Sequence, residues 1–292
     1  MVNRSRVIPA RLKGRLRGGG AAEILLLRDV SSEHGPGAWE AFVRPGRRLH
    51  PGARVAINEA LEAEVETRAI AVDGRRRVRL LARQGDLESV LEASGAPPLP
   101  PYIRRKARPE DRERYQTVFA REAGSVAAPT AGLHFTEALL ARLAARGIQR
   151  TEVLLHVGPG TFQPVKVANV EDHRIAPEPF VVPAEAAAAV QEARSRGGRV
   201  VAVGTTAVRT LETAARDDRT VEASQGETAL VVVPGFRFRV VDALLTNFHL
   251  PRSSLLLLVC AFAGRERVLA AYAEARRAGY RFYSYGDAML IL

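Results

Sequence analysis

The sequence predicts an α/β protein: a large, mostly parallel sheet domain with helices, plus a small all-β, barrel-like domain. Residues 6–83 contain short apolar runs separated by glycine and proline turns, which is typical of small barrels. After residue 101, strand-like and helix-like segments alternate, which favours a parallel sheet covered by helices. Residues 97–101 read Pro-Pro-Leu-Pro-Pro, a stiff linker. We therefore expect a barrel-like domain over residues 1–97 and an α/β domain over residues 98–292.

The composition is that of an ordinary globular protein. Hydrophobic residues make up 47% and charged residues 26% of the chain, which excludes a disordered protein. The single cysteine, Cys260, excludes an internal disulfide, and the longest apolar run, residues 255–263, is too short to span a membrane. Because the N-terminus carries no apolar leader either, we expect a soluble, cytoplasmic protein. The net charge of +11 suits a polyanionic partner such as nucleic acid.

The barrel-like region is predicted from alternating side chains. In residues 61–67, apolar or small residues alternate with glutamates, which is the period of a strand with one buried face. The other predicted strands are residues 24–27, 41–43, 55–57 and 78–81. Two basic clusters, residues 11–17 and 75–79, either contact phosphates or form a solvated strand face. A short helix is expected over residues 86–93.

The region after the linker alternates between strands and helices. Residues 102–114 carry six basic and three acidic residues, which makes them a further candidate for phosphate contacts. Thr136 is a suitable N-cap for a helix that ends at Gly147. The predicted strands are residues 153–157, 200–203, 230–233 and 240–245. The further predicted helices are residues 184–196, 205–214, 253–263 and 265–278.

Residues 200–212 (VVAVGTTAVRTLE) combine a buried strand, a glycine turn and a helix start. Either Thr205 or Thr206 is suited to cap the helix. The free N–H groups of a helix N-terminus bind anions, and an open α/β sheet binds ligands at this edge. Arg209 and Glu212 lie one turn further on and are placed to face the same crevice. The alternative interpretation is an ordinary strand–helix unit without a ligand.

Three other turns are rich in polar residues: 129–136, 156–162 and 246–251. Four histidines in or near such turns are suited to acid, base or hydrogen-bonding roles near neutral pH, although each is by itself more typical of a structural residue. These are His134, His156, His173 and His249. The spacing of histidine, cysteine and carboxylate residues supports no metal site, and residues 158–161 match neither nucleotide-binding glycine motif.

Taken together, these segments resemble the S-adenosylmethionine:tRNA ribosyltransferase-isomerases of the queuosine pathway. The resemblance covers essentially the whole chain in order, through residues 6–12, 98–103, 113–118, 125–136, 155–165, 203–212, 244–253 and 283–289. Three features differ from the family pattern. The usual several dozen residues before Arg6 are absent, Arg4 stands where an aspartate is typical, and Ala176 stands where a second histidine is usual.

The resemblance implies an enzyme that transfers and isomerises the ribosyl group of S-adenosylmethionine onto the 7-aminomethyl-7-deazaguanine base of a tRNA anticodon loop. The product is epoxyqueuosine-tRNA, and adenine and methionine are released. S-adenosylmethionine is then a substrate, and no cofactor or metal ion is implied. The partners are S-adenosylmethionine and tRNA, with no membrane, and the enzyme is expected to be a monomer or homodimer.

The resemblance also implies roles for individual residues, in the larger domain above all. The catalytic candidates are His134, His249 and Glu212, with one of the histidines as the base. The substrate-binding candidates are Thr130, Thr161, Thr205, Thr206, Arg209, Asn247 and Arg252. The tRNA-binding candidates are Arg6, Arg11, Arg104 and Arg105. Two alternatives are a diverged enzyme that modifies a small amine and a non-catalytic protein that only binds tRNA.

Overall fold

The computed structural model describes residues 1–71, 73–158, 160 and 165–292. The chain forms two compact units. The smaller unit comprises Val7–Tyr115 and Ala123–Ala127, and the larger one comprises Met1–Arg6, Gln116–Glu122 and Ala128–Leu292. The smaller unit therefore continues beyond the boundary expected at residue 97, and residues 1–6 belong to the larger unit.

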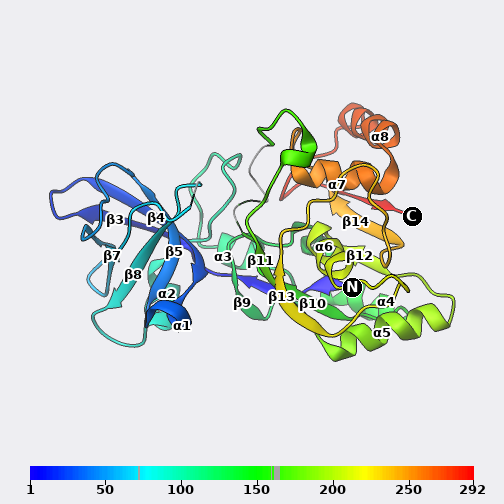
Figure 1. Ribbon diagram of the computed structural model, residues 1–292, viewed down its shortest axis with the longest axis horizontal. Coiled ribbons are helices and arrows are strands. Elements are labelled where there is room, and N and C mark those ends of the chain that lie inside the picture. The colour runs from blue at the N-terminus through cyan, green and yellow to red at the C-terminus, as the bar shows by residue number, and fades with distance from the viewer. Residues whose placement is uncertain (72, 159, 161–164) are drawn as a thin grey trace. The chain divides into compact units, whose positions relative to one another are not determined.

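The smaller unit is built on a closed barrel, as the sequence predicts (Figure 1). Its strands follow the order β3-β4-β5-β8-β7-β6, and each pairs with its neighbours in antiparallel fashion. The strands are β3 (Arg11–Leu16), β4 (Ala21–Asp29), β5 (Ala38–Arg44), β6 (Arg54–Ala56), β7 (Leu61–Val65) and β8 (Arg76–Ala82). The helices of this unit are α1 (Ser31–His34), α2 (Leu87–Ser94) and α3 (Asp111–Arg114).

The alternation expected for residues 61–67 is present in β7. Leu61, Ala63 and Val65 are fully buried in the barrel core, whereas the glutamates between them are partly exposed. The sequence prediction did not list β3 among its individual strands, although a solvated strand face was one of its two interpretations of residues 11–17. Lys13 in this strand is exposed while Leu12 is fully buried, so β3 also has one face in the core and one in solvent.

The larger unit contains mixed sheets. One sheet has the order β1-β10-β11-β13, another has the order β12-β14-β15, and β2 pairs with β9. The strands of the larger unit are β1 (Val2–Asn3), β10 (Glu152–Leu155), β11 (Glu178–Val182), β12 (Val201–Val203), β13 (Ser224–Thr228), β14 (Ala243–Asn247) and β15 (Ala288–Ile291). Strands β2 (Ser5–Val7) and β9 (Glu122–Ser125) each contain residues of both units. The α-helices of the larger unit are α4 (Glu137–Ala145), α5 (Ala184–Ser195), α6 (Thr205–Thr213), α7 (Ser254–Ala263) and α8 (Arg265–Arg277), with 3-10 helices η1 (Thr130–His134) and η3 (Val170–Asp172).

The α/β class is confirmed, but the sheets are less parallel than expected. In the described parts of these two sheets, the β1–β10 and β12–β14 pairs are parallel, and the pairs made by β11, β13 and β15 are antiparallel. The strand predicted at residues 230–233 is wrong. That segment has no ladder partner among the described residues, and the carbonyl of Leu230 instead accepts a hydrogen bond from the Arg209 side chain.

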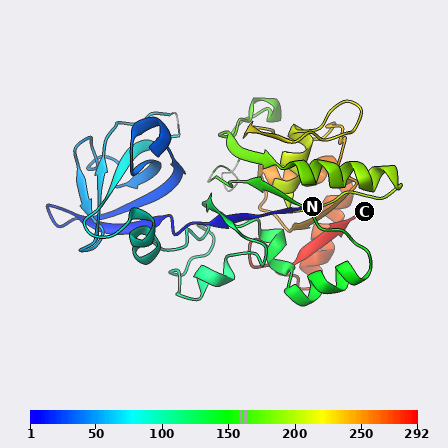
Figure 2. The same cartoon turned by 90° about the horizontal axis from the view of Figure 1, so that it is seen from below.

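Helix α6 packs against strands of both sheets, including β10, β11, β12 and β14. Figure 2 shows α4 and α5 on opposite sides of strand β1. Backbone bonds also join the two sheets, because the N–H of Val203 in β12 donates to the carbonyl of Met1 beside β1 (3.0 Å). Helix α6 thus contacts two sheets that are themselves joined by a backbone hydrogen bond. None of the helices in the described residues is both long and apolar enough to cross a membrane.

Candidate active site

Three of the polar turns meet in the larger unit. The N–H of Gly204, at the start of α6, donates to the carbonyl of Leu245 in β14 (2.8 Å). A Cβ atom at Gly204 would lie 3.7 Å from the Cβ of Ala131 in η1, so these turns are in contact. A small apolar cluster that includes Phe119, Ala131 and Val203 lies beneath them. The packing therefore brings together segments that are far apart in the sequence.

Asn247 and His134 form the polar centre of this junction. The side-chain amide of Asn247 donates to the carbonyl of Tyr283 (3.0 Å) and contacts Nε2 of His134 (3.3 Å). Because the carbonyl is an acceptor only, the amide nitrogen must face it, and the second N–H of that nitrogen is directed to His134. His134 is consequently the tautomer that carries its proton on Nδ1. The Oδ1 atom of Asn247 is buried and has no hydrogen-bond partner among the described residues.

The charge state of His134 follows from its surroundings. Partial removal of water lowers the pKa of His134 below its ordinary value, the carboxylate of Asp287 opposes this shift, and the guanidinium of Arg281 reinforces it. Asp287 is itself paired with Arg281 (2.9 Å), which weakens its effect on the histidine. His134 is therefore neutral at pH 7, in the same state that the contact with Asn247 requires.

Replacing Asn247 with aspartate is expected to raise the pKa of His134 by about 1–3 pH units, because a carboxylate close to an imidazole stabilises its charged form. NMR titration of the His134 ring would measure the change. The variant Asn247→Leu is the control, since it removes the amide without adding charge and should produce no such rise. An unchanged His134 titration in the aspartate variant would show that residue 247 does not contact the ring.

His249 lies just beyond the end of β14, in a different environment. Its Nε2 is 2.7 Å from the hydroxyl of Thr246, and its backbone N–H donates to the phenol oxygen of Tyr272 (2.7 Å). Burial lowers the pKa of His249 to about 4 and raises the pKa of Tyr272 to about 12. Both groups are therefore uncharged near pH 7. Since a hydroxyl can either donate or accept, the contact with Thr246 leaves the tautomer of His249 open.

The start of α6 offers hydrogen-bond donors. The N-cap is Gly204, with φ of 87°, and not Thr205 or Thr206 as expected, so within the described residues no side chain caps the first N–H groups. The φ of 87° favours glycine at this turn. Thr205 and Thr206 are both buried, and the hydroxyl of Thr206 has no hydrogen-bond partner in the described part of the chain. These groups suit an anionic ligand at the helix N-terminus.

Arg209 was expected to bind substrate, but its contacts are within the protein. Its Nε donates to the carbonyl of Leu230 (2.9 Å), Nη2 donates to that of Thr228 (3.2 Å), and Nη1 forms an ion pair with Glu178. The other carboxylate oxygen of Glu178 accepts the N–H of Gly158 (2.6 Å). Both side chains of the pair are only 6% exposed. Arg209 therefore connects α6 to β11, to β13 and, through Glu178, to Gly158.

Glu212 was expected to be catalytic, and its contacts support a structural role instead. Its carboxylate accepts the backbone N–H groups of Arg239 (2.8 Å), Val240 (3.0 Å) and Val241 (2.9 Å). The residue is 5% exposed. Because both oxygens are used, the carboxylate fixes the segment that leads into β14.

The variant Glu212→Gln is expected to lower the free energy of unfolding by about 1–3 kcal/mol, because one acceptor oxygen is replaced by a donor that faces backbone N–H groups. Urea unfolding followed by circular dichroism would measure this loss. Catalytic activity per folded molecule should change only a few-fold. A fully stable variant that has lost activity more than about 100-fold would instead point to the catalytic role.

The other substrate-binding candidates are spread around this group. Thr130 begins η1 and is half-buried. Arg252 is exposed in the turn before α7 and has a positive φ of 55°, and its carbonyl accepts the N–H of Val165 (2.7 Å). Thr161 lies outside the described residues. The structure thus groups His134, Asn247 and the start of α6.

The four arginines proposed for tRNA differ in their contacts. Arg6 and Arg104 are exposed. Arg11 pairs with Glu23 (2.5 Å), and Arg105 forms a bidentate pair with Asp111 (2.5 and 2.7 Å). The latter two side chains therefore already have anionic partners within the protein.

Two contributors to the site were assigned no role from the sequence: Tyr283 and Asp287. The carbonyl of Tyr283 orients Asn247, and the carboxylate of Asp287 acts on His134. Tyr283 has a positive φ of 73°, which a sequence pattern does not reveal. The residue in the sequence that could have indicated this tight turn is Gly286. A Cβ atom there would lie only 2.5 Å from the carbonyl oxygens of Arg281 and Phe282, so the turn excludes a larger residue.

Comparison with known proteins identifies the family. The model of the family described as "Queuosine biosynthesis protein" matches residues 1–291. The chain belongs to this family. The contact between His134 and Asn247, and the bond between Gly204 at the start of α6 and Leu245 in β14, therefore occur in a member of the queuosine biosynthesis family.

Relatives in this family are similar over nearly the whole of this chain. A protein of Moorella thermoacetica named S-adenosylmethionine:tRNA ribosyltransferase-isomerase is 52% identical, over 100% of this chain and 84% of its own length. Proteins with the same name are 56% identical in an Anaeromyxobacter species and 54% identical in Thermus thermophilus, over 99% of this chain and 82% and 83% of their own lengths. A solved S-adenosylmethionine tRNA ribosyltransferase of Thermotoga maritima is 39% identical over 100% of this chain and 81% of its own, with a TM-score of 0.49.

Proposed function

We propose that this protein is an S-adenosylmethionine:tRNA ribosyltransferase-isomerase. It transfers and isomerises the ribosyl group of S-adenosylmethionine onto 7-aminomethyl-7-deazaguanine in the anticodon loop of tRNA, and it forms epoxyqueuosine-tRNA. The observation that carries the proposal is the sequence identity of 52–56%, over essentially the entire chain, to relatives with that name. The enzyme is proposed to act in the cytoplasm as a monomer or homodimer.

S-adenosylmethionine supplies the reactivity for this reaction. The sulfonium acidifies the C5′ protons and makes methionine a good leaving group. Removal of a C5′ proton begins the sequence, adenine departs, the amine of the RNA base attacks, and ring closure to the epoxide expels methionine. We therefore propose that S-adenosylmethionine is a substrate and that no cofactor or metal ion takes part.

His249 is the stronger candidate for the base that removes the C5′ proton. Nε2 of His134 accepts from the amide of Asn247, so its Nδ1 carries a proton and can act only as a donor. Nε2 of His249 contacts a hydroxyl, which accepts a hydrogen bond as readily as it donates one. His249 can therefore present a basic Nδ1 without losing that hydrogen bond. We assign proton removal to His249 and hydrogen-bond donation toward the substrate to His134.

Two buried atoms without partners in the described residues support the binding of an amino acid group. The hydroxyl of Thr206 and the first N–H groups of α6 are donors, which suit the methionine carboxylate. Oδ1 of Asn247 is an acceptor, which suits the methionine ammonium or a ribose hydroxyl. Gly204 begins α6 and bonds to Leu245, two residues before Asn247 in β14, so both groups lie at the same ends of neighbouring strands.

The decisive test is incubation with S-adenosylmethionine and an anticodon stem-loop that carries the aminomethyl base, followed by mass spectrometry of the RNA and chromatography of adenine. The expected result is conversion of the base to epoxyqueuosine with stoichiometric adenine. A stem-loop with unmodified guanine at that position is the control and should remain unchanged. Adenine release without modified RNA would overturn the assignment of tRNA as the acceptor.

A further inference from the structure

Two segments at one end of the barrel in the smaller unit carry basic residues without acidic ones, and Glu23, which lies across the sheet from Lys13 and Arg44, is paired with Arg11. Residues 11–20 and 44–54 contain eight lysines and arginines and no aspartate or glutamate. Arg11 and Arg54 pair with Glu23 and Glu64 on neighbouring strands. The other six are all exposed, and among the described residues none of them takes part in an ion pair. These six are Lys13, Arg15, Arg17, Arg44, Arg47 and Arg48.

The two segments form one surface, here called the barrel tip and defined as residues 13–20 and 44–48. The β3–β4 hairpin is closed by the N–H of Leu16, which donates to the carbonyl of Gly20 (2.8 Å). A Cβ atom at Gly20 would lie 3.5 Å from Nη1 of Arg48, so the hairpin and the 44–48 turn are in contact. Beneath the turn, Arg76 donates to the carbonyls of Gly46 (2.8 Å) and Leu49 and braces it.

The end of the β3–β4 hairpin is also accessible to the phosphodiester backbone of a nucleic acid. A Cβ atom added to Gly18 or Gly19 would have no neighbouring atom within 4 Å, so the space beside these two residues is open. Gly19 has φ of 86°, a conformation that favours glycine. Glycines without side chains allow a phosphodiester backbone to approach the polypeptide closely. The charge and the shape of the barrel tip therefore both fit a polyanion.

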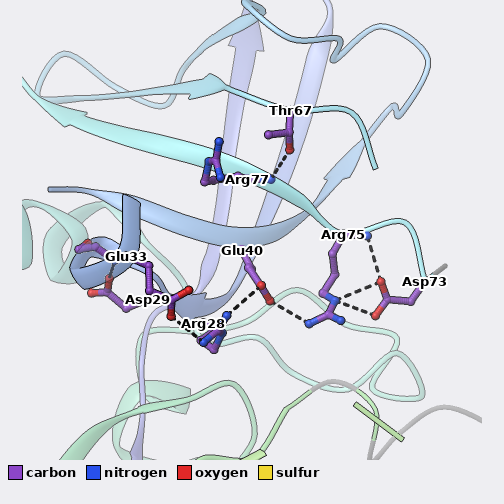
Figure 3. A network of polar contacts seen from close by, with 9 residues as sticks. Arg28, Asp29, Glu33, Glu40, Thr67, Asp73, Arg75 and Arg77 are labelled. Carbon is purple, nitrogen blue, oxygen red and sulfur yellow. Dashed lines mark hydrogen bonds and ion pairs between the residues drawn. The ribbon is translucent and has the colours of Figure 1, made fainter. Parts of the chain in front are cut away.

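A second basic cluster of the barrel contrasts with the tip. Figure 3 shows Arg28 and Arg75 bound to Glu40, and Arg75 bound also to Asp73. Arg77 and Arg79 share Glu66 (2.7 and 2.5 Å). The arginines of residues 75–79 thus neutralise acidic neighbours or, like Arg76, bind carbonyl oxygens. The two basic clusters of the sequence are therefore not equivalent, and only the one at residues 11–17 belongs to a surface where the described residues leave positive charge unpaired.

We propose that the barrel tip is an RNA-binding surface that contacts phosphates of the tRNA outside the modified base. The proposal rests on the proposed function, which supplies the polyanionic partner. Arginines and lysines that neutralise phosphates release counterions, so the contribution of this surface to binding decreases steeply with salt concentration. The contacts carry no sequence information, and they hold the tRNA in position while the larger unit acts on one base.

The test compares two triple variants of the full chain that each lose three positive charges. The tip variant is Arg17→Gln, Arg47→Gln and Arg48→Gln. The matched control is Arg28→Gln, Arg77→Gln and Arg83→Gln, whose arginines pair with Glu33 or Glu40, Glu66 and Glu62. Binding of unmodified tRNA is measured from about 50 mM to about 500 mM salt. The tip variant should show a log–log salt slope that is shallower by about 2–3, which corresponds to about 100-fold weaker binding at about 0.1 M salt.

The control variant should bind tRNA with the slope of the wild-type protein. A third variant, with lysine at the three tip positions, should keep that slope because it keeps the charge, and the fluorescence of Trp39 in β5 verifies that each barrel is folded. Equal slopes for the tip variant and the wild type would overturn the proposal, as would equal losses in the tip and control variants. Loss of binding to anionic phospholipid vesicles with unchanged tRNA binding would assign the surface to membranes instead.

The RNA-binding surface and the proposed function can be disproved independently of each other. If the wild-type protein modifies the stem-loop but the tip variant binds full-length tRNA normally, only the RNA surface is wrong. If the wild-type protein produces no epoxyqueuosine yet shows the expected difference in salt slope, the surface stands and the enzymatic assignment is wrong.

Discussion

Replacing His249 with glutamine is expected to slow adenine release from S-adenosylmethionine by about 100- to 10,000-fold, the usual contribution of a general base. The glutamine amide can keep a hydrogen bond to Thr246, so the local structure should persist while the basic nitrogen is lost. Single-turnover adenine release with saturating S-adenosylmethionine and stem-loop would measure the effect. Substitution of His34, an exposed histidine of the barrel, is the matched control and should leave the rate unchanged.

The pH dependence separates His249 from other candidate bases. Burial lowers the pKa of His249 to about 4, so its ring is neutral from about pH 8 down to about pH 5. The rate should therefore be nearly constant over that range and decline only as pH approaches about 4. An acid limb centred near about pH 6.5 would assign proton removal to a group with an ordinary histidine pKa and would exclude His249.

The same pKa predicts a loss of stability in acid. The unfolded chain binds a proton at His249 as pH falls below about 6.5, whereas the folded protein binds it only near a pH of about 4. Because the unfolded state then holds more protons, the free energy of unfolding decreases as pH falls through this window. Rates in this acidic range should accordingly be measured together with circular dichroism, and divided by the folded fraction.

Replacing Arg209 with methionine is expected to lower the free energy of unfolding of the larger unit by about 3–5 kcal/mol. Methionine fills similar volume but leaves the buried carboxylate of Glu178 without its cation, and an unpaired buried charge is costly. The carbonyls of Leu230 and Thr228 lose donors as well. Hydrogen exchange of the amides in α6, β11 and β13 should become faster, whereas the amides of β4 and β5 in the barrel serve as the reference.

The double variant Arg209→Met, Glu178→Gln is the control for this interpretation. It removes both charges and should recover part of the lost stability, because a neutral amide costs less to bury than a carboxylate. Glutamine also retains an acceptor for the N–H of Gly158. If Arg209→Met is as stable as the wild type but binds S-adenosylmethionine more than about tenfold more weakly, Arg209 contacts the substrate and the structural role is wrong.

Several elements followed from local sequence patterns. The Thr136 and Ser253 side chains cap α4 and α7, because an N-cap depends only on residues three positions apart. The barrel strands with period-two alternation were also predictable, since alternation directly reflects one buried face. Strand β3 was not listed as a separate strand, because its basic residues and its central glycine obscure that period and only Leu12 and Leu16 of this strand pack in the barrel core.

The roles of charged side chains were less predictable. Arg209 and Glu212 lie one turn apart on α6 and were both expected to face a ligand, yet each bonds to partners 19 to 31 residues away along the chain. A sequence pattern places such residues on a helix but does not state which carbonyl or carboxylate the fold brings to them. For the same reason, the similar basic clusters at residues 11–17 and 75–79 differ in the structure.

Local periodicity and an ordered series of motifs along the chain are enough to predict the α/β-plus-barrel class, the main helices and the family. Three features depend instead on packing between distant segments: Asn247 contacts Nε2 of His134, Arg209 and Glu212 bond to groups of the protein itself, and basic side chains without ion pairs among the described residues lie together at the barrel tip. The physical reason is that a hydrogen bond or ion pair requires two groups within about 3 Å of each other, and folding selects which distant groups meet at that separation.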